Sequence, residues 1–327
     1  VVEFDDVSAA ISRQYVCVIT QRQNYDDVGG EVKCWGEAGA SHNGVYDVPS
    51  NLTFVQVVTG TSFGCGLGID QKVTCWGAYQ GMEVDGLYTQ ISAHTYYACG
   101  IRTDESINCW GSSTPFDHPT DEKIRFRMID CYQHHCCALE TDGTPHCFGK
   151  VGDAEGTVKH THLNPPRILV DVDSTIDNEE EEEDGYDEIE EVDESAPKMK
   201  FKKVSVADGF SCGITLEKDL KCWGRLKEMN MPLDIVPGPF KYLSAGHNGV
   251  CVLYDEMLAE PGEENVSHKM KCLGLAARLV PSRELTEEYD QVVVDRSGIC
   301  AVTMNSEFKC WSNVKSINEI PEGIIIA

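Results

Sequence analysis

Cysteine is the residue type in this sequence with the widest chemistry, since a cysteine can bind a metal, attack a substrate or form a disulfide. The chain has 16 cysteines in 327 residues. Fourteen of them fall into pairs, ten positions apart in five cases and further apart in two. The pairs are Cys65/Cys75, Cys99/Cys109, Cys137/Cys147, Cys212/Cys222 and Cys300/Cys310, with the longer Cys17/Cys34 and Cys251/Cys272. Cysteines that are paired in disulfides cannot act as nucleophiles or metal ligands.

The spacing of the pairs predicts β-hairpins. Turn-forming residues lie midway between the partners, for example Asp142-Gly143, and short apolar or alternating runs such as 212–216 flank them. Two cysteines equidistant from a hairpin turn face each other across antiparallel strands, at a distance that a disulfide can bridge. Each pair is therefore expected to staple one hairpin. A closed loop of about eleven residues contributes roughly 2–3 kcal/mol of stability in an oxidising compartment.

Cys131 and Cys136 remain outside the regular pairs, and three arrangements are open for them. They are five positions apart and could close a small extra loop. Cys136 is adjacent to Cys137, so these two could exchange partners. Cys131 could also pair with another chain.

The segment Asp171–Glu194 contains 15 acidic residues and no basic one. Such a run is typical of a solvated loop, although clustered carboxylates also bind divalent cations. The oxygen-ligand positions of a twelve-residue calcium loop are occupied by Asp171, Asp173, Thr175, Asp177, Glu179 and Glu182. Ile176 stands where that loop requires glycine, which argues against an EF-hand. The cofactor prediction is therefore none, or Ca²⁺ held loosely by these carboxylates.

Other candidate sites are sparse. His134, His135 and His146 surround the Cys137 pair and could bind zinc or copper, but ordinary polar loop residues are the better interpretation because Cys137 is already paired. The sequence has no glycine-rich phosphate loop and no His-Glu-x-x-His motif. We therefore predict no enzyme activity and no catalytic residue.

Two sequons predict N-glycosylation in a secreted protein. They are Asn51-Leu52-Thr53 and Asn265-Val266-Ser267. Asn265 falls in the long loop between Cys251 and Cys272, where a glycan would fit.

The elements that must position the cysteines form an internal repeat. Every tryptophan directly follows a cysteine, at Trp35, Trp76, Trp110, Trp223 and Trp311, and Phe148 and Leu273 complete the series. A third apolar run, such as 54–58 or 201–205, precedes each cysteine pair. Three or four strands per copy, repeated about every 40 residues, are typical of a propeller blade.

The predicted fold is an all-β, seven-bladed β-propeller with one disulfide-stapled hairpin per blade, in a single domain over residues 1–327. The blades are expected at about 1–50, 51–86, 87–122, 123–198, 199–239, 240–288 and 289–327. The acidic segment, residues 150–198, is expected to be an insertion loop within the fourth blade.

The repeat resembles a known superfamily. An aromatic residue, then a step such as Ile91-Ser92-Ala93, then Cys99-Gly100 and Cys109-Trp110-Gly111 resembles the regulator of chromosome condensation superfamily of seven-bladed propellers. The paired cysteines are similar to those of its extracellular branch, which includes the ectodomains of plant Crinkly-type receptor kinases. The resemblance covers the chain apart from residues about 150 to 198. It implies the fold but no single function, since the superfamily includes exchange factors, inhibitors, receptors and scaffolds.

Charge narrows the classes of partner. Acidic residues outnumber basic ones 54 to 27, for a net charge of −27. Nucleic acid and anionic membrane surfaces would be repelled. No apolar run reaches the length that spans a bilayer. The chain starts at Val1 without a leader, as a processed secreted protein would, and a truncated chain would look the same.

We therefore expect a secreted or extracellular protein in an oxidising compartment that serves as a protein-interaction or structural module. Its partner would be a protein, a glycan or a second copy of the chain. The expected contact surfaces are the loops that break the repeat, residues 21–31, 151–197 and 255–268. The alternatives are a receptor ectodomain fragment, a subunit of an extracellular assembly or filament, and a calcium-dependent binder acting through the acidic loop.

Overall fold

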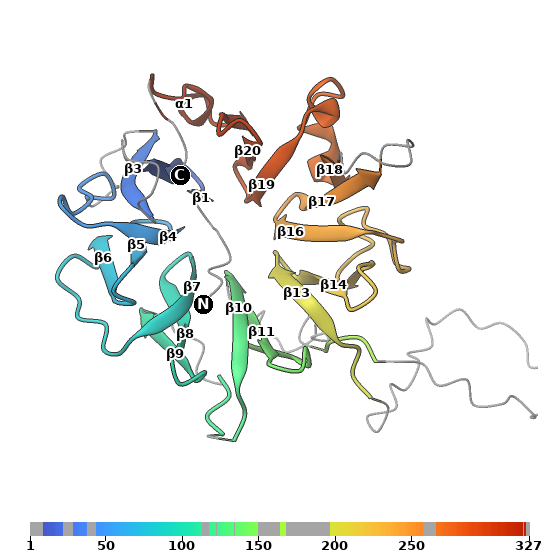
Figure 1. Ribbon diagram of the computed structural model, residues 1–327, viewed down its shortest axis with the longest axis horizontal. Coiled ribbons are helices and arrows are strands. Elements are labelled where there is room, and N and C mark those ends of the chain that lie inside the picture. The colour runs from blue at the N-terminus through green and yellow to red at the C-terminus, as the bar shows by residue number, and fades with distance from the viewer. Residues whose placement is uncertain are drawn as a thin grey trace, which may run out of the picture.

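The computed structural model of the protein describes residues 9–21, 29–37, 44–112, 118–121, 123–133, 135–149, 164–167, 197–257, 266–322 and 324. Among these residues the only α-helix is the short α1 (Lys315–Asn318), and two 3₁₀ turns, η2 (Leu275–Arg278) and η3 (Glu284–Thr286), accompany it. No helix within the described ranges is long and apolar enough to cross a membrane. Small antiparallel sheets stand around a central axis, as in a β-propeller (Figure 1). The predicted all-β class is confirmed.

The strands follow one another in triplets, each with an inner, a middle and an outer strand. They are β1 (Ala9–Ile11), β2 (Tyr15–Gln21), β3 (Gly30–Gly36); β4 (Phe54–Thr59), β5 (Phe63–Gly68), β6 (Val73–Gly77); β7 (Tyr88–His94), β8 (Tyr97–Arg102), β9 (Ile107–Gly111); β10 (Phe126–Tyr132), β11 (His135–Glu140), β12 (Pro145–Gly149); β13 (Phe201–Val206), β14 (Phe210–Thr215), β15 (Leu220–Gly224); β16 (Phe240–Gly246), β17 (Gly249–Met257), β18 (Val266–Gly274); and β19 (Tyr289–Val294), β20 (Gly298–Thr303), β21 (Phe308–Ser312). A bridge between Gly30 and Phe54 joins the first two triplets into one six-stranded sheet.

A buried aromatic residue begins most inner strands and packs over the middle strand of its own triplet. Phe54 and Phe201 are examples, exposed by 1% and 0%. A Cβ added at Gly66 or Gly213 would lie 2.3 or 2.4 Å from Cδ1 of Phe54 or Phe201, respectively. Only glycine leaves room for the ring, which explains why glycine follows the middle-strand cysteine in these triplets.

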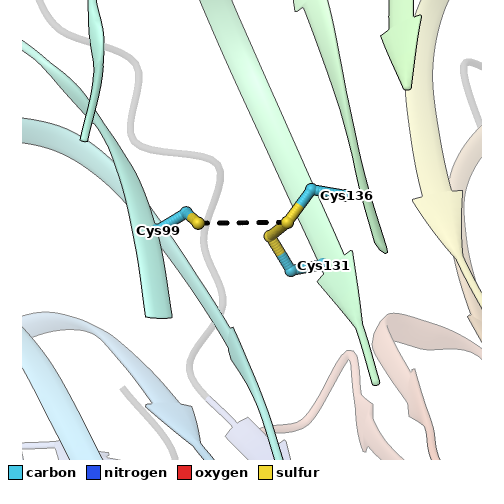
Figure 2. A group of neighbouring side chains, drawn as sticks. All are labelled: Cys99, Cys131 and Cys136. Carbon is cyan, nitrogen blue, oxygen red and sulfur yellow. Dashed lines mark hydrogen bonds between the residues drawn. A yellow bond between two sulfur atoms is a disulfide. The ribbon is translucent and has the colours of Figure 1, made fainter. Parts of the chain in front are cut away.

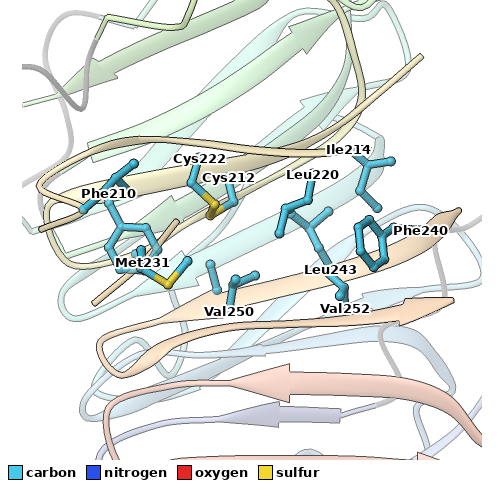
Figure 3. Packing of buried hydrophobic residues seen from close by; sticks show 13 residues of the cluster. Phe210, Cys212, Ile214, Leu220, Cys222, Met231, Phe240, Leu243, Val250 and Val252 are labelled. Carbon is cyan, nitrogen blue, oxygen red and sulfur yellow. A yellow bond between two sulfur atoms is a disulfide. The ribbon is translucent and has the colours of Figure 1, made fainter. Parts of the chain in front are cut away.

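The hydrophobic core consists of layers between neighbouring triplets. In one layer, Phe210 and Leu220 of β14 and β15 meet Val250 of β17 (Figure 3). The Cys212–Cys222 disulfide lies in the same layer. Burying an apolar side chain of this size stabilises the fold by roughly 1.5–3 kcal/mol. Each triplet is therefore held mainly by its two neighbours.

The ring closes where the first triplet meets the last. Trp35 Nε1 donates a hydrogen bond to the carbonyl of Ile317 at 3.2 Å. The Trp35 ring meets Phe308 edge to face, with centroids 5.7 Å apart. Ser297 Oγ donates to the carbonyl of Ser12 at 2.7 Å. Side-chain packing and these hydrogen bonds therefore join the two ends of the repeat.

Candidate functional site

All sixteen cysteines are joined in eight disulfides, so no free thiol remains. They are Cys17–Cys34, Cys65–Cys75, Cys99–Cys109, Cys131–Cys136, Cys137–Cys147, Cys212–Cys222, Cys251–Cys272 and Cys300–Cys310. Seven of them join the middle to the outer strand of a triplet, between residues directly opposite in register, such as Cys65 and Cys75. The eighth, Cys131–Cys136, joins inner strand β10 to middle strand β11.

Three sulfur atoms gather between β8 and the β10–β11 hairpin (Figure 2). The Sγ atoms of Cys99, Cys131 and Cys136 lie within 4.8 Å of one another, a geometry that could suit a metal if they were thiolates. Each of them is in a disulfide, however, so none can bind a metal as a thiolate.

The inner strands line a central channel with a cavity of about 150 Å³. A polar belt, Ser92, Asp130, Ser205 and Ser244, lies at one level of its wall, each residue opposite the first cysteine of its triplet's staple. Each belt side chain accepts a backbone N–H from the next inner strand. These bonds run from Cys131 N to Ser92 Oγ (3.0 Å), Val206 N to Asp130 Oδ2 (2.8 Å), Ala245 N to Ser205 Oγ (2.9 Å) and Val294 N to Ser244 Oγ (2.9 Å). The belt therefore links adjacent triplets around the channel.

Asp130 is the one carboxylate of the polar belt. Its hydrogen bonds within the protein leave neither oxygen free to bind a metal ion. Oδ1 accepts from Ser92 Oγ and Cys131 N, both at 3.0 Å. Oδ2 accepts from Ser205 Oγ and Val206 N, both at 2.8 Å. Desolvation raises the pKa of Asp130, and the hydrogen bonds oppose this only in part. Both oxygens accept hydrogen bonds from the protein itself, so the role of Asp130 is to link neighbouring triplets of the ring.

A second polar group, the channel bridge, spans one end of the channel and consists of His94, Tyr132 and Asp295. Tyr132 Oη donates to Asp295 Oδ1 at 3.0 Å, and the His94 ring stacks on Tyr132 with centroids 3.9 Å apart. The Gln133 N–H donates to His94 Nδ1 at 2.9 Å, so the neutral ring carries its proton on Nε2, which points to Asp295 Oδ1 at 3.4 Å. Burial, and next the charge of Asp295, raise the pKa of Tyr132, which therefore stays protonated.

Most polar side-chain atoms of the channel bridge are engaged within the protein. Both ring nitrogens of His94 are engaged by the protein, so the ring has no nitrogen with which to accept a substrate proton. Asp295 is 3% exposed, and its Oδ2 has no hydrogen-bond partner within the described part of the chain. This oxygen can accept a hydrogen bond from water or a small donor. The bridge joins β7 and β10 to the turn after β19 across this end of the channel.

The turns between inner and middle strands form a rim at the bridged end of the ring. Asp208 Oδ2 accepts from His247 Nδ1 at 2.7 Å and from Gln133 Nε2 at 3.4 Å. Arg225 Nη2 lies 3.6 Å from Asp208 Oδ1. Tyr96, in the turn between β7 and β8, is 51% exposed. The rim thus presents charged, amide and aromatic groups to solvent.

The other predicted sites are placed only in part. Asn51 is exposed in the turn before β4, at φ 68°, so its amide is accessible to a glycan. Asn265 and the five candidate calcium ligands, Asp171, Asp173, Asp177, Glu179 and Glu182, lie outside the described residues, as does most of the acidic segment. Most of each predicted contact loop lies outside them too.

The polar belt and channel bridge were missed by the sequence analysis. The signal for Asp130 is a break in the repeat: Ile129-Asp130-Cys131 stands where other copies have steps such as Ile91-Ser92-Ala93. Asp295 has no such signal, because its partners come from the other side of the ring.

Comparison with known proteins identifies solved structures with a similar fold. No family model matches the chain. A 53-residue stretch is 40% identical to the serine/threonine-protein kinase-like protein CCR2 of Arabidopsis thaliana, and it spans 16% of this chain but only 7% of that protein. Similar solved structures are the CRINKLY WD40 ectodomain of the Arabidopsis thaliana receptor kinase ACR4 (20% identity, 98% of each chain, TM-score 0.62), the entire ectodomain of the Physcomitrella patens receptor kinase CR4 (20%, 93% of this chain and 73% of that one, 0.61) and yeast RCC1 (Prp20) bound to Kap60 (11%, 84% and 73%, 0.51). The predicted resemblance to Crinkly-type and RCC1-type propellers is confirmed at the level of the fold.

Proposed function

We propose that this chain is a non-catalytic protein-interaction module that works outside the cytosol, in an oxidising compartment. The observation that carries the proposal is the eight disulfides, which use every cysteine of the chain. Thiol pools of the cytosol and nucleus keep such bonds reduced, whereas secreted and cell-surface proteins retain them. Two structurally similar proteins are named as receptor-kinase ectodomains, which agrees with this location.

The propeller has seven blades in this proposal, one for each triplet of strands, and the acidic segment 150–198 is an insertion in the fourth. Support for the count comes from the cysteine staple, which recurs once in each triplet at the same register. Support for the insertion comes from its position between β12 and β13.

The partner binds the rim at the bridged end of the ring. Tyr132 and Asp295 join across that end of the channel, so recognition takes place on the turns rather than inside the channel. Tyr96 offers an exposed aromatic ring, and aromatic residues are enriched at the centres of protein interfaces. With a net charge of −27, the chain favours a partner with a basic surface.

A narrower second candidate is a receptor ectodomain. The similarity that favours it spans 98% of this chain and 98% of the ACR4 ectodomain chain. The candidate requires a membrane anchor in the full gene product. A complete coding sequence without one would remove it and leave the broader proposal unchanged.

Free-thiol labelling of protein from its native source tests the location. Labelling with a maleimide, before and after denaturation and without reductant, should modify no cysteine. Modification of most cysteines would overturn the proposal.

Cross-linking followed by mass spectrometry tests the rim. Partners captured on the cell surface or in the secreted fraction should be lost with Tyr96→Ser. The matched control is Leu216→Ser, because Leu216 is 45% exposed in the turn between β14 and β15, at the opposite end of the ring. Equal capture by both variants would refute the rim as the binding surface.

A further inference from the structure

Two disulfides meet where the triplet β7–β9 packs against the triplet β10–β12 (Figure 2). The Sγ atoms of Cys99 and Cys136 lie 3.9 Å apart. Cys99 is bonded to Cys109 and Cys136 to Cys131, so neither sulfur carries a hydrogen and the pair is in van der Waals contact. This is the one group of three such sulfur atoms within the described residues. The Cys131–Cys136 bond has no counterpart in the other triplets.

Solvent reaches the four sulfur-bearing residues unequally. Cys99 and Cys136 are fully buried, and Cys131 is 4% exposed. Cys109, on the outer strand β9, is only partly buried. An external reductant therefore meets the Cys99–Cys109 bond first, and at its Cys109 end.

We propose that these four cysteines form a thiol–disulfide exchange site whose co-reactant is a dithiol, such as dithiothreitol or a protein with a vicinal pair of thiols. A thiolate of the dithiol attacks Cys109 Sγ, which breaks the Cys99–Cys109 bond and releases Cys99 as a thiolate. Cys99 then attacks Cys136 Sγ, which forms a Cys99–Cys136 bond and releases Cys131. The second thiol of the dithiol attacks its own mixed disulfide and releases Cys109.

The exchange balances as a two-electron reduction. The dithiol becomes a disulfide, and its two protons end on Cys109 and Cys131. Of the two disulfides present at the start, the protein keeps one, now between Cys99 and Cys136. Two disulfides within triplets are thus replaced by one disulfide between neighbouring triplets, which joins β8 to β11.

The surroundings favour Cys136 as the target of the freed Cys99. Once Cys109 has left, the Cys99 side chain can rotate toward the Cys131–Cys136 bond, whose nearer sulfur is already in contact. The Tyr97 hydroxyl lies 3.4 Å from the His135 carbonyl oxygen and 3.5 Å from Cys136 Sγ, and it can donate its hydrogen bond to either acceptor. Burial raises the pKa of Tyr97, so its proton is retained. No other triplet has a second disulfide at this place.

Disulfide mapping after limited reduction tests the exchange site. The native protein is treated with about one equivalent of dithiothreitol, quenched with acid, alkylated and digested for mass spectrometry. A peptide pair linked through Cys99 and Cys136, absent from the untreated protein, should appear after reduction. Cys109 and Cys131 should be alkylated. The inference does not depend on the partner or on the location of the protein.

The Cys300–Cys310 bond is an internal control, because Cys310 is also partly buried but has no third sulfur beside it. Its reduction should leave Cys300 and Cys310 alkylated together. A Cys131→Ser/Cys136→Ser variant, which keeps the seven repeat staples, should likewise yield alkylated Cys99 with Cys109. If wild-type protein gives that same pattern with Cys131–Cys136 intact, the exchange site is refuted. Resistance of Cys99–Cys109 to excess dithiothreitol, while Cys300–Cys310 is reduced, refutes it equally.

Discussion

Tyr132 and Asp295 meet across the central channel, where the tyrosine hydroxyl donates a 3.0 Å hydrogen bond to the aspartate although 163 positions separate the two residues. Tyr132 ends the inner strand β10, and Asp295 directly follows the inner strand β19 on the other side of the ring. The contact therefore forms only when the fourth and seventh triplets stand on opposite sides of the channel. It makes the channel bridge a sensitive reporter of how these triplets are arranged.

Removing the donor of this bond should destabilise the protein. In Tyr132→Phe, Asp295 keeps only its longer contact with His94, and an unsatisfied buried acceptor costs about 1–3 kcal/mol. Denaturant unfolding under non-reducing conditions measures the loss. Tyr96→Phe is the control, because that exposed hydroxyl should change stability by less than about 0.5 kcal/mol. Equal effects of the two variants would contradict a role for the bridge.

Asp130 should make stability depend on pH. Its pKa in the folded protein is raised above the ordinary value of 3.8, so the folded state holds the proton more tightly than the unfolded state. The favourable contribution is complete below about pH 3.8 and is lost as pH rises through the raised folded pKa. Asp130→Ser, which restores the serine of the polar belt, should therefore gain stability relative to wild type as pH rises from 3.8.

Thermal unfolding of the Asp130→Ser and wild-type proteins across this pH range measures the difference. Asp130→Ala provides the comparison, since alanine removes the charge and also leaves the Val206 N–H without its acceptor. It should be less stable than Asp130→Ser at every pH. A stability difference between wild type and Asp130→Ser that does not change with pH would contradict the pKa argument.

A single staple should be measurable by itself. Cys65→Ser/Cys75→Ser opens a loop of ten-residue separation and should lower the free energy of unfolding by about 2–3 kcal/mol. Unfolding without reductant measures this loss. The two proteins should become nearly equal in stability once both are fully reduced, and a persistent gap would assign the loss to side-chain packing instead.

Thr53→Ala tests the glycan at Asn51 without altering the residue that adopts φ 68°. Expression in a eukaryotic secretory pathway should give a wild-type protein heavier by one glycan at this position, as intact-mass measurement would detect. The variant should lack that increment and fold normally, because Thr53 lies outside the strands. Unmodified Asn51 in the wild-type protein would refute the site.

The acidic segment is predicted to bind calcium loosely. Calorimetry should detect binding with a dissociation constant of about 0.1–1 mM, because clustered carboxylates without a shaped loop have low affinity for calcium. The affinity should decrease as the salt concentration rises. A variant with Asp171, Asp173 and Asp177 changed to asparagine should bind less. Equal heats for the two proteins, or no heat at all, would dismiss calcium as a ligand of these residues.

Hairpins and their staples were predictable because the information for them is local. Cys65 and Cys75 are placed opposite each other by a turn of a few residues, and the same reasoning applies wherever a pair is ten positions apart. The partner of Cys131 was open, since three pairings satisfied the sequence. In the structure Cys131 lies directly opposite Cys136 in the β10–β11 register, while Cys137 lies opposite Cys147 in the next pair of strands.

Spacing and residue type along the chain were thus enough to predict strands, turns, staples and the all-β class, because each depends on nearby residues, at most 21 positions apart for a repeat staple. They could not predict that Asp295 would meet His94 and Tyr132, or that Cys99 would touch Cys136. Those contacts join residues from different triplets, at separations of 201, 163 and 37 positions. Their geometry depends on how closely the sheets pack and where the ring closes, which is a property of the whole assembly of core layers.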